Sequence, residues 1–334
     1  MGKSEKKGNA FTNNPIVKAI GTQKIVVFSV IILLVLFFSA ISPAFRKYST
    51  VVSIFDYSYY ISLMAIGVTF PLITGGVDLS IGTGTIACGL IGGSLIINAG
   101  APVAVGMLAS IGFGLLLGAF NALTIAKLEL PPFIATLGSM MVARGLGSIM
   151  AGAMSITWPT VGNKGGWFRS IFKLRIGDTM VPIGFLIIIV LVIIMSIILN
   201  KTRVGRYIIA IGSNKEATRL SGIKVVKYHS IAYLIAGLFT GFAGIAYAAT
   251  FQAVVPGTGA GLELDAIAGA IIGGTSMTGG YGTIGGTLLG VFVMSLLKTG
   301  LPFIGLQANW QQIITGIVLL VAVFIDIIRH TKKN

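Results

Sequence analysis

Seven polar or charged side chains occur within or beside long apolar stretches of this 334-residue chain, where such groups are costly. They are Asp78, Ser80, Asn121, Arg144, Gln252, Glu263 and Asp265. The chemistry open to them is ion pairing, binding of polar groups and control of a conformational change. Catalysis is not indicated, because His229 and His330 belong to no H-E-x-x-H motif and to no nucleophile–base arrangement.

Asp78 stands in a short polar break between Gly75-Gly76 and Gly82. Glycine permits backbone conformations and close helix approach that larger residues forbid. Three interpretations are open. Asp78 or Ser80 caps the first amides of the following helix, or Asp78 takes part in conformational coupling, or it acts as a ligand carboxylate.

Arg144 lies about thirteen residues into an apolar segment that begins near Pro132, or about 19 Å along a helix, which is inside the hydrocarbon slab. It must therefore face protein or a water-filled cavity. We consider an internal salt bridge or carbonyl clamp, and alternatively a polar group near the conduction path. Glu263 and Asp265 are possible partners or helix-start residues, and the sequence does not pair them.

Several aromatic and amide side chains are of the kinds that bind sugars, through packing of rings on C–H surfaces and hydrogen bonds to hydroxyls. They are Tyr57, Tyr59, Tyr60, Asn121, Gln252, Trp310, Gln311 and Gln312. The competing interpretation is that Tyr and Trp near helix ends are anchors at the membrane interface.

The elements that position these residues are predicted to be membrane helices. The chain is 55% hydrophobic and 10% charged, with a mean hydropathy of +0.95, which predicts an all-α polytopic membrane protein. About ten apolar segments fit membrane elements, at 25–41, 52–74, 79–98, 102–126, 132–151, 180–199, 228–250, 262–277, 283–300 and 309–328. The segment 262–277 is short and Gly-rich, so we expect it to be broken or re-entrant.

The distribution of the basic residues predicts the orientation. With both termini in the cytoplasm, the inner segments 1–24, 127–131, 200–227 and 329–334 carry 16 of the 24 Lys and Arg, and the outer segments 42–51 and 152–178 carry six. We therefore expect a cytoplasmic tail over 1–24, a transmembrane domain over 25–328 and a second cytoplasmic tail over 329–334. The external loop 152–178 is the exception, because it carries four basic residues. It is also the longest external loop, so we expect it to bind an external partner.

The net charge of +15 does not point to nucleic acid, because no patch interleaves basic residues with exposed aromatic ones. The lone Cys88 and the two His cannot build a disulfide framework or a common zinc site, so no metal is expected. The chain contains no G-x-x-x-x-G-K-[ST] phosphate cradle, so we do not expect it to hydrolyse ATP.

The segments 75–86 and 273–284, which lie 198 residues apart, have similar sequences and form a local echo of each other. Internal repeats are common in transporters. An inverted repeat should place equivalent motifs on opposite sides of the membrane, whereas ten crossings place both segments at the cytoplasmic side. Either the eighth segment does not span, or the echo reflects two Gly-rich turns with similar roles.

The polar interval at 205–224 has the composition of a short amphipathic docking helix. Ser213 followed by Glu216 fits a capping box, and Gly222 supplies a helix stop. Between them Ala217 and Leu220 form a small apolar knob that suits a soluble partner. The candidate docking residues are Ser213, Asn214, Glu216, Ala217, Arg219, Leu220, Ser221 and Gly222.

These landmarks resemble those of a known family, the inner-membrane permease subunits of bacterial ABC importers for ribose, galactose, xylose and related sugars. The resemblance rests on the segments 75–82, 131–138 with Arg144-Gly145, 201–205, 212–223, 263–268 and 273–280, in family order. It implies the ABC importer permease fold, a bacterial inner-membrane location, and coupling to a motor through residues 212–223.

The resemblance also implies partners. These are a second permease copy, cytoplasmic ATPase subunits that use ATP and Mg, an extracytoplasmic sugar-binding protein and the surrounding membrane lipid. No cofactor is expected on this chain. The alternatives are an ion-coupled secondary transporter of small polar solutes, for which Asp78 and Asp265 are the candidate ion sites, and a non-transport scaffold or intramembrane enzyme.

Overall fold

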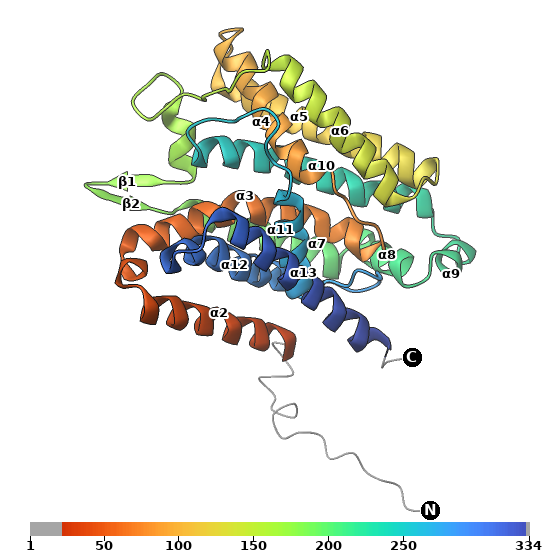
Figure 1. Cartoon of the computed structure of the whole chain (residues 1–334). Coiled ribbons are helices and arrows are strands. Elements are labelled where there is room, and N and C mark those ends of the chain that lie inside the picture. The colour runs from red at the N-terminus through yellow and green to blue at the C-terminus, as the bar shows by residue number, and fades with distance from the viewer. Residues whose placement is uncertain (1–21, 332–334) are drawn as a thin grey trace, which may run out of the picture.

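A computed structural model describes residues 22–331 as a bundle of helices that run side by side between two exposed ends (Figure 1). One end carries the short helix α9 (Lys215–Leu220), and the other carries a hairpin of β1 (Leu174–Ile176) and β2 (Thr179–Val181). We call them the α9 end and the hairpin end. Of the described helices, the first begins and the last ends at the α9 end.

Eight of the described helices are long and apolar enough to cross a membrane. They are α2 (Thr22–Ile41), α3 (Tyr48–Ile73), α5 (Val103–Asn121) with its continuation, α6 (Pro132–Met150), α7 (Gly184–Lys201), α10 (Val225–Thr250), α12 (Ile284–Gly300) and α13 (Ala308–Thr331). Two shorter helices, α4 (Ile81–Ile97) and α11 (Leu262–Ile272), occupy the other two predicted segments. The prediction of an all-α polytopic protein with about ten membrane elements, some of them broken, is confirmed.

The two short helices belong to broken crossings that enter the bundle from opposite ends. A non-helical stretch at 74–80 leads from the α9 end into α4, and the stretch at 251–261 leads from the hairpin end into α11. At 1.5 Å per residue, α11 is only about 16 Å long, about half of the hydrocarbon thickness. The first turns of the two helices touch, because a methyl group added at Gly82 would clash with the Glu263 carboxylate.

Glycine allows the central helices α5 and α10 to approach closely. Gly114 and Gly118 on α5 face Gly237 and Gly241 on α10, and a methyl group at Gly118 would lie 3.0 Å from the Cα of Gly237. Both pairs have the four-residue spacing that places small residues on one helix face, as in close helix contacts within membranes. This contact builds the middle of the bundle, against which α3 and α4 also pack.

The two Gly-rich turns that resemble each other in sequence lie together at the α9 end. The amide of Gly280 donates a hydrogen bond of 2.8 Å to the carbonyl of Ile73, and Gly279 lies against the amide of Gly75. Both turns contain glycines with positive φ, which residues with a side chain rarely adopt.

Candidate functional site

The predicted docking helix is present as α9, but its first residue differs from the prediction. Asn214 is the N-cap, and its Oδ1 accepts the amide of Ala217 at 2.9 Å. The proposed capping box of Ser213 and Glu216 is wrong, because Ser213 ends the preceding helix and the Glu216 carboxylate pairs with Arg219 at 2.8 Å. Asn is as good an N-cap as Ser, so the sequence alone did not distinguish the two positions.

Another helix precedes α9, and the sequence did not predict it as a separate element. It is α8 (Arg203–Ser213), whose N-cap Thr202 accepts the amide of Gly205. Its buried residues Gly205, Ile208 and Ile211 recur every three residues and form one face. Helix α8 therefore packs on the bundle, and α9 follows it at the outer end (Figure 1).

Helix α9 presents most of its surface to the exterior. Leu220 is 84% exposed, Ala217 is also exposed, and only Thr218 is buried. Ala217 and Leu220 form an apolar tip on this helix. The ion pair of Glu216 and Arg219 forms a charged rim beside it. The helix ends at Leu220 with Ser221 as its C-cap, and Gly222 follows with φ +77°, so the predicted glycine stop lies where expected.

Two contacts join the α9 region to other loops at this end. Lys215 forms a 3.2 Å ion pair with Glu129, in the loop between α5 and α6. Gly212 lies against the Ile73 carbonyl and the Gly280 amide, where a side chain would not fit. The α8–α9 region is therefore in contact with the α5–α6 loop and with the two Gly-rich turns at this end.

A buried polar cluster lies between these loops and the bundle. The Asp78 Oδ1 accepts the Ser80 amide at 2.9 Å and the Ser80 hydroxyl at 2.6 Å, and Asn121 donates to the Ser80 hydroxyl at 2.9 Å. All three side chains are buried. Neither Asp78 nor Ser80 caps the amides inside α4, so the capping interpretation is wrong in detail, although the carboxylate lies at the helix N-terminus, where negative charge is favoured.

The backbone after Asn121 departs from α-helical geometry. Residues Ala122–Lys127 form a π-helix, in which Leu128 donates to Leu123 at 3.0 Å. Short π-helical turns within α-helices are frequent at functional sites. This segment leads along the chain from Asn121, which bonds to Ser80 in the Asp78 cluster, to Glu129, which pairs with Lys215 on α9.

Arg144 is exposed on the outer face of α6, near the middle of its length. It donates a hydrogen bond of 3.1 Å to the Gly257 carbonyl and lines an open cleft of about 520 Å³ with Ser148 and Pro256. The carbonyl clamp is thus present. Glu263 and Asp265, considered as partners of Arg144 or as helix-start residues, have other partners and lie in the first turn of α11.

Those partners lie within the bundle. The Glu263 carboxylate accepts the Gly261 amide at 3.0 Å, at the first turn of α11. Asp265 is fully buried and lies 3.2 Å from the ammonium group of Lys298 on α12. The pair fixes the broken crossing to a full-length helix, because separating two buried charges in this setting is costly.

The side chains proposed as sugar ligands do not gather in one place. Asn121 is buried toward the α9 end, whereas Gln252 is exposed just beyond α10, toward the hairpin end. The rings of Tyr57 and Tyr60 are tilted by 60° to each other with their centroids 5.4 Å apart, and Tyr60 contacts Tyr247. Tyr57 and Tyr60 therefore pack among aromatic rings, whereas Trp310 is exposed.

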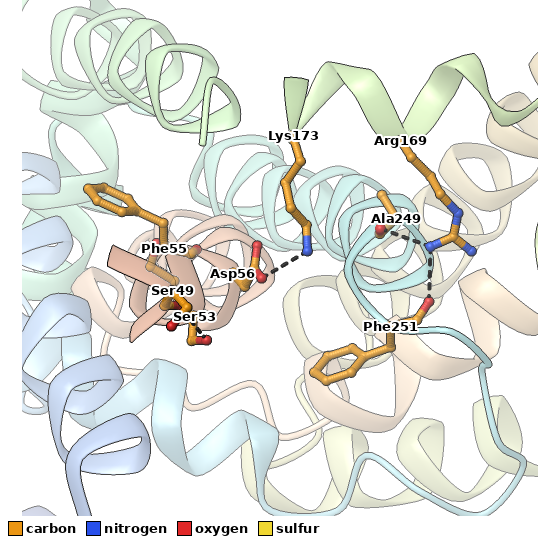
Figure 2. A network of polar contacts seen from close by, with 9 residues as sticks. Ser49, Ser53, Phe55, Asp56, Arg169, Lys173, Ala249 and Phe251 are labelled. Carbon is orange, nitrogen blue, oxygen red and sulfur yellow. Dashed lines mark hydrogen bonds and ion pairs between the residues drawn. The ribbon is translucent and has the colours of Figure 1, made fainter. Parts of the chain in front are cut away.

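The loop 152–178, which was predicted to be external, is attached to the bundle by two basic residues whose role the sequence did not reveal (Figure 2). Lys173 forms a 2.8 Å ion pair with Asp56 on α3. Arg169 donates to the carbonyls of Ala249 and Phe251, at the end of α10, and burial lowers its pKa. Lys173 and Arg169 therefore bond to other parts of the protein. This explains why the loop carries more basic residues than the positive-inside rule predicts for an external segment.

Comparisons with known proteins match almost the whole chain. The family model described as branched-chain amino acid transport system / permease component matches residues 50–323. The chain is 36% identical over 304 residues to the ribose import permease protein RbsC of Escherichia coli K12, covering 89% of this chain and 91% of that protein. It is 33% identical to the fructose import permease protein FruG of Bifidobacterium longum, covering 89% and 88%.

A third relative carries a different sugar name. The chain is 32% identical over 322 residues to the galactose/methyl galactoside import permease protein MglC of Haemophilus influenzae, covering 92% of this chain and 95% of that protein. No solved structure matches the chain.

Proposed function

The chain belongs to the branched-chain amino acid transport system / permease component family, and we propose that it carries a monosaccharide into a bacterial cell as the permease subunit of an ABC importer. The observation that supports this best is the exposed helix α9 in a chain similar over about nine tenths of its length to sugar import permeases. A sugar is favoured over an amino acid because the three relatives are named for ribose, fructose and galactose.

The energy source is proposed to be a separate ATPase. The sequence has no phosphate cradle, so ATP and Mg would be bound by that partner and not by this chain. The apolar tip formed by Ala217 and Leu220, with its charged rim, suits a pocket on such a partner. Rigid-body motion of the helices would then follow a displacement of α9.

The α9 end is proposed to face the cytoplasm and the hairpin end the exterior, in the inner membrane. The excess of basic residues at the α9 end supports this orientation. The hairpin end would receive the sugar-binding protein, and it carries exposed apolar side chains suited to a protein contact, among them Val161, Trp167 and Ile176.

A second permease copy is proposed to cover the outer face of α6. A guanidinium at this depth cannot face hydrocarbon without a large cost, so Arg144 needs protein or water in front of it. Gly138 and Gly145 lie on exposed parts of the same helix, with open space where a side chain would be. Small residues of this kind allow close approach of a neighbouring helix, and the cleft beside Arg144 would then border the sugar path.

Arg144→Leu is expected to lower uptake at least about tenfold, because a hydrogen bond from a charged group contributes roughly 1.5 to 3 kcal/mol. Arg144→Lys keeps the charge and should lose less. The measurement is uptake per amount of folded protein in the membrane. If Arg144→Leu were expressed more strongly than the parent protein and took up sugar normally, Arg144 would face lipid. That result would contradict a sugar path beside Arg144.

The proposed cargo is tested in cells with and without this gene. Uptake of radiolabelled ribose, fructose, galactose and leucine is measured at low external concentration. We expect the deletion to reduce uptake of at least one sugar and to leave leucine uptake unchanged. Loss of leucine uptake with all three sugars unaffected would overturn the assignment of a sugar.

A further inference from the structure

The open cleft beside Arg144 is lined by a single charged side chain. Its walls are α6 with the turn that follows it and the segment 251–261, which leads into α11. Among the described residues that line the cleft only Arg144 is ionisable, and the others are small, apolar or neutral, such as Met141, Ser148 and Pro256. A solute in the cleft would therefore meet one positive group and no acidic side chain on the same walls.

The guanidinium group reaches across the cleft. Met141, Arg144 and Ser148 are three and four residues apart, so their side chains leave α6 on one face. The Arg144 Nη2 donates to the Gly257 carbonyl at 3.1 Å, and a methyl group added at Gly257 would lie 3.5 Å from the same nitrogen. The charge of Arg144 therefore lies beside any solute that occupies the space between the two walls.

Arg144 has donors left for a solute. A guanidinium group has five N–H donors and no acceptor. Within the described chain the structure gives Arg144 one side-chain hydrogen bond, the one to Gly257. The remaining donors suit the oxygen atoms of a neutral or anionic solute, whereas a cationic solute would be repelled by the same group.

The carboxylates that follow the cleft along the chain do not neutralise this charge. Glu263 is 7% exposed and accepts the Gly261 amide, and Asp265 is fully buried beside the Lys298 ammonium. Both side chains belong to α11 within the bundle, whereas Arg144 is exposed on the outer face of α6. Arg144 therefore dominates the electrostatic potential in the cleft.

We propose that Arg144 makes this cleft selective by charge, so that neutral and anionic solutes enter it and cations are excluded. A fixed positive group that lines a path is an electrostatic barrier to cations. The inference rests on the proposed function, in which the cleft borders the sugar path. It specifies the cargo as a neutral or acidic sugar rather than an amino sugar, and the same charge would keep sodium ions out of the path.

The test compares the rates at which a cysteine in the cleft reacts with two thiol reagents of opposite charge. Cys88 is the only cysteine of the sequence and is buried, so Ser148→Cys introduces the reactive thiol. The full-length protein in nanodiscs is treated with sulfonatoethyl methanethiosulfonate, which is anionic, or trimethylammonioethyl methanethiosulfonate, which is cationic. Intact-protein mass spectrometry follows the modification. Thr179→Cys, on the exposed strand β2, provides the rate ratio outside the cleft.

We expect the ratio of the anionic to the cationic rate to be at least about tenfold higher for Ser148→Cys than for Thr179→Cys. One unit charge at about 4 Å in water changes each rate about fivefold, and the two reagents are affected in opposite directions. Adding Arg144→Gln to Ser148→Cys should abolish this excess, whereas adding Arg144→Lys should preserve it. Added salt should reduce the excess in Ser148→Cys itself, which requires no change at Arg144.

Equal ratios at the two positions, or a ratio that is the same with Arg144 and with Arg144→Gln, would overturn the proposed charge selection. Failure of both reagents to modify Ser148→Cys would also overturn it, because no aqueous solute would then enter the cleft. Sugar uptake by the parent protein is measured separately. Failure of the proposed transport function would appear as absent uptake, whereas failure of charge selection alone would leave that uptake intact.

Discussion

Replacement of Leu220 by Asp is expected to stop ATP-driven uptake while the protein still folds and inserts. Leu220 is 84% exposed, so its replacement removes little buried surface. In a pocket on the ATPase, the added carboxylate would be left poorly solvated, which costs about 2 kcal/mol or more and weakens binding about thirtyfold. The measurements are co-purification of the ATPase and uptake by reconstituted vesicles.

The control for this variant lies at the opposite end of the molecule. Ile176→Asp places the same charge on an exposed apolar residue of β1, and we expect it to leave ATPase co-purification unchanged. Ala217→Asp, next to Leu220 on the tip of α9, should behave like Leu220→Asp. Full ATPase co-purification with full uptake by both α9 variants would refute the docking role of this helix.

The second large effect is expected at the intramembrane ion pair. Asp265→Asn leaves the Lys298 ammonium buried without its counter-ion, and breaking a buried pair in this way costs about 3 to 5 kcal/mol. Lys298→Met should be as damaging. The double variant Asp265→Asn/Lys298→Met removes both charges and should recover most of the lost stability.

The fraction of protein that stays monodisperse after heating in detergent measures this effect. Asp178→Asn provides the control, because its pair with Arg175 is exposed, and exposed pairs contribute about 1 kcal/mol or less. Single variants of Asp265 and Lys298 as heat-resistant as the parent, or a double variant no better than either, would show that the pair does not hold α11 in place.

The membrane helices could be predicted because hydropathy is a local property. Each of the ten predicted segments contains one apolar helix, and even the shortness of the segment that begins at 262 was visible in its Gly-rich sequence. The position of α9 could also be predicted, since Gly222 is a strong stop signal. Its first residue was misplaced by one position because Ser213 and Asn214 are both good N-caps.

The pairing of the charged residues could not be predicted, since it depends on which helices become neighbours. Asp265 and Lys298 are 33 positions apart, and Lys173 meets Asp56 across 117 positions. For Arg144 the sequence left a salt bridge and a carbonyl clamp open, and the structure places a backbone carbonyl and an open cleft beside it. The sequence did contain one indication of these contacts. The loop 152–178 carries four basic residues although the positive-inside rule predicts few there, and such an exception indicates that some of them bond within the protein.

The ion-coupled alternative requires a free intramembrane carboxylate that can bind a cation. Asp265 already has the Lys298 ammonium beside it, and Asp78 accepts two hydrogen bonds from Ser80. Neither arrangement favours a coupling ion, and the similarity to import permeases supports the ATP-driven function.

Uptake by proteoliposomes that contain this chain tests the central claim most directly. Labelled sugar is offered with its binding protein, with or without the ATPase and ATP, and under an imposed proton or sodium gradient. We expect accumulation only when both the ATPase and ATP are present, with no response to either gradient alone. Accumulation driven by an ion gradient in vesicles that lack the ATPase would contradict it.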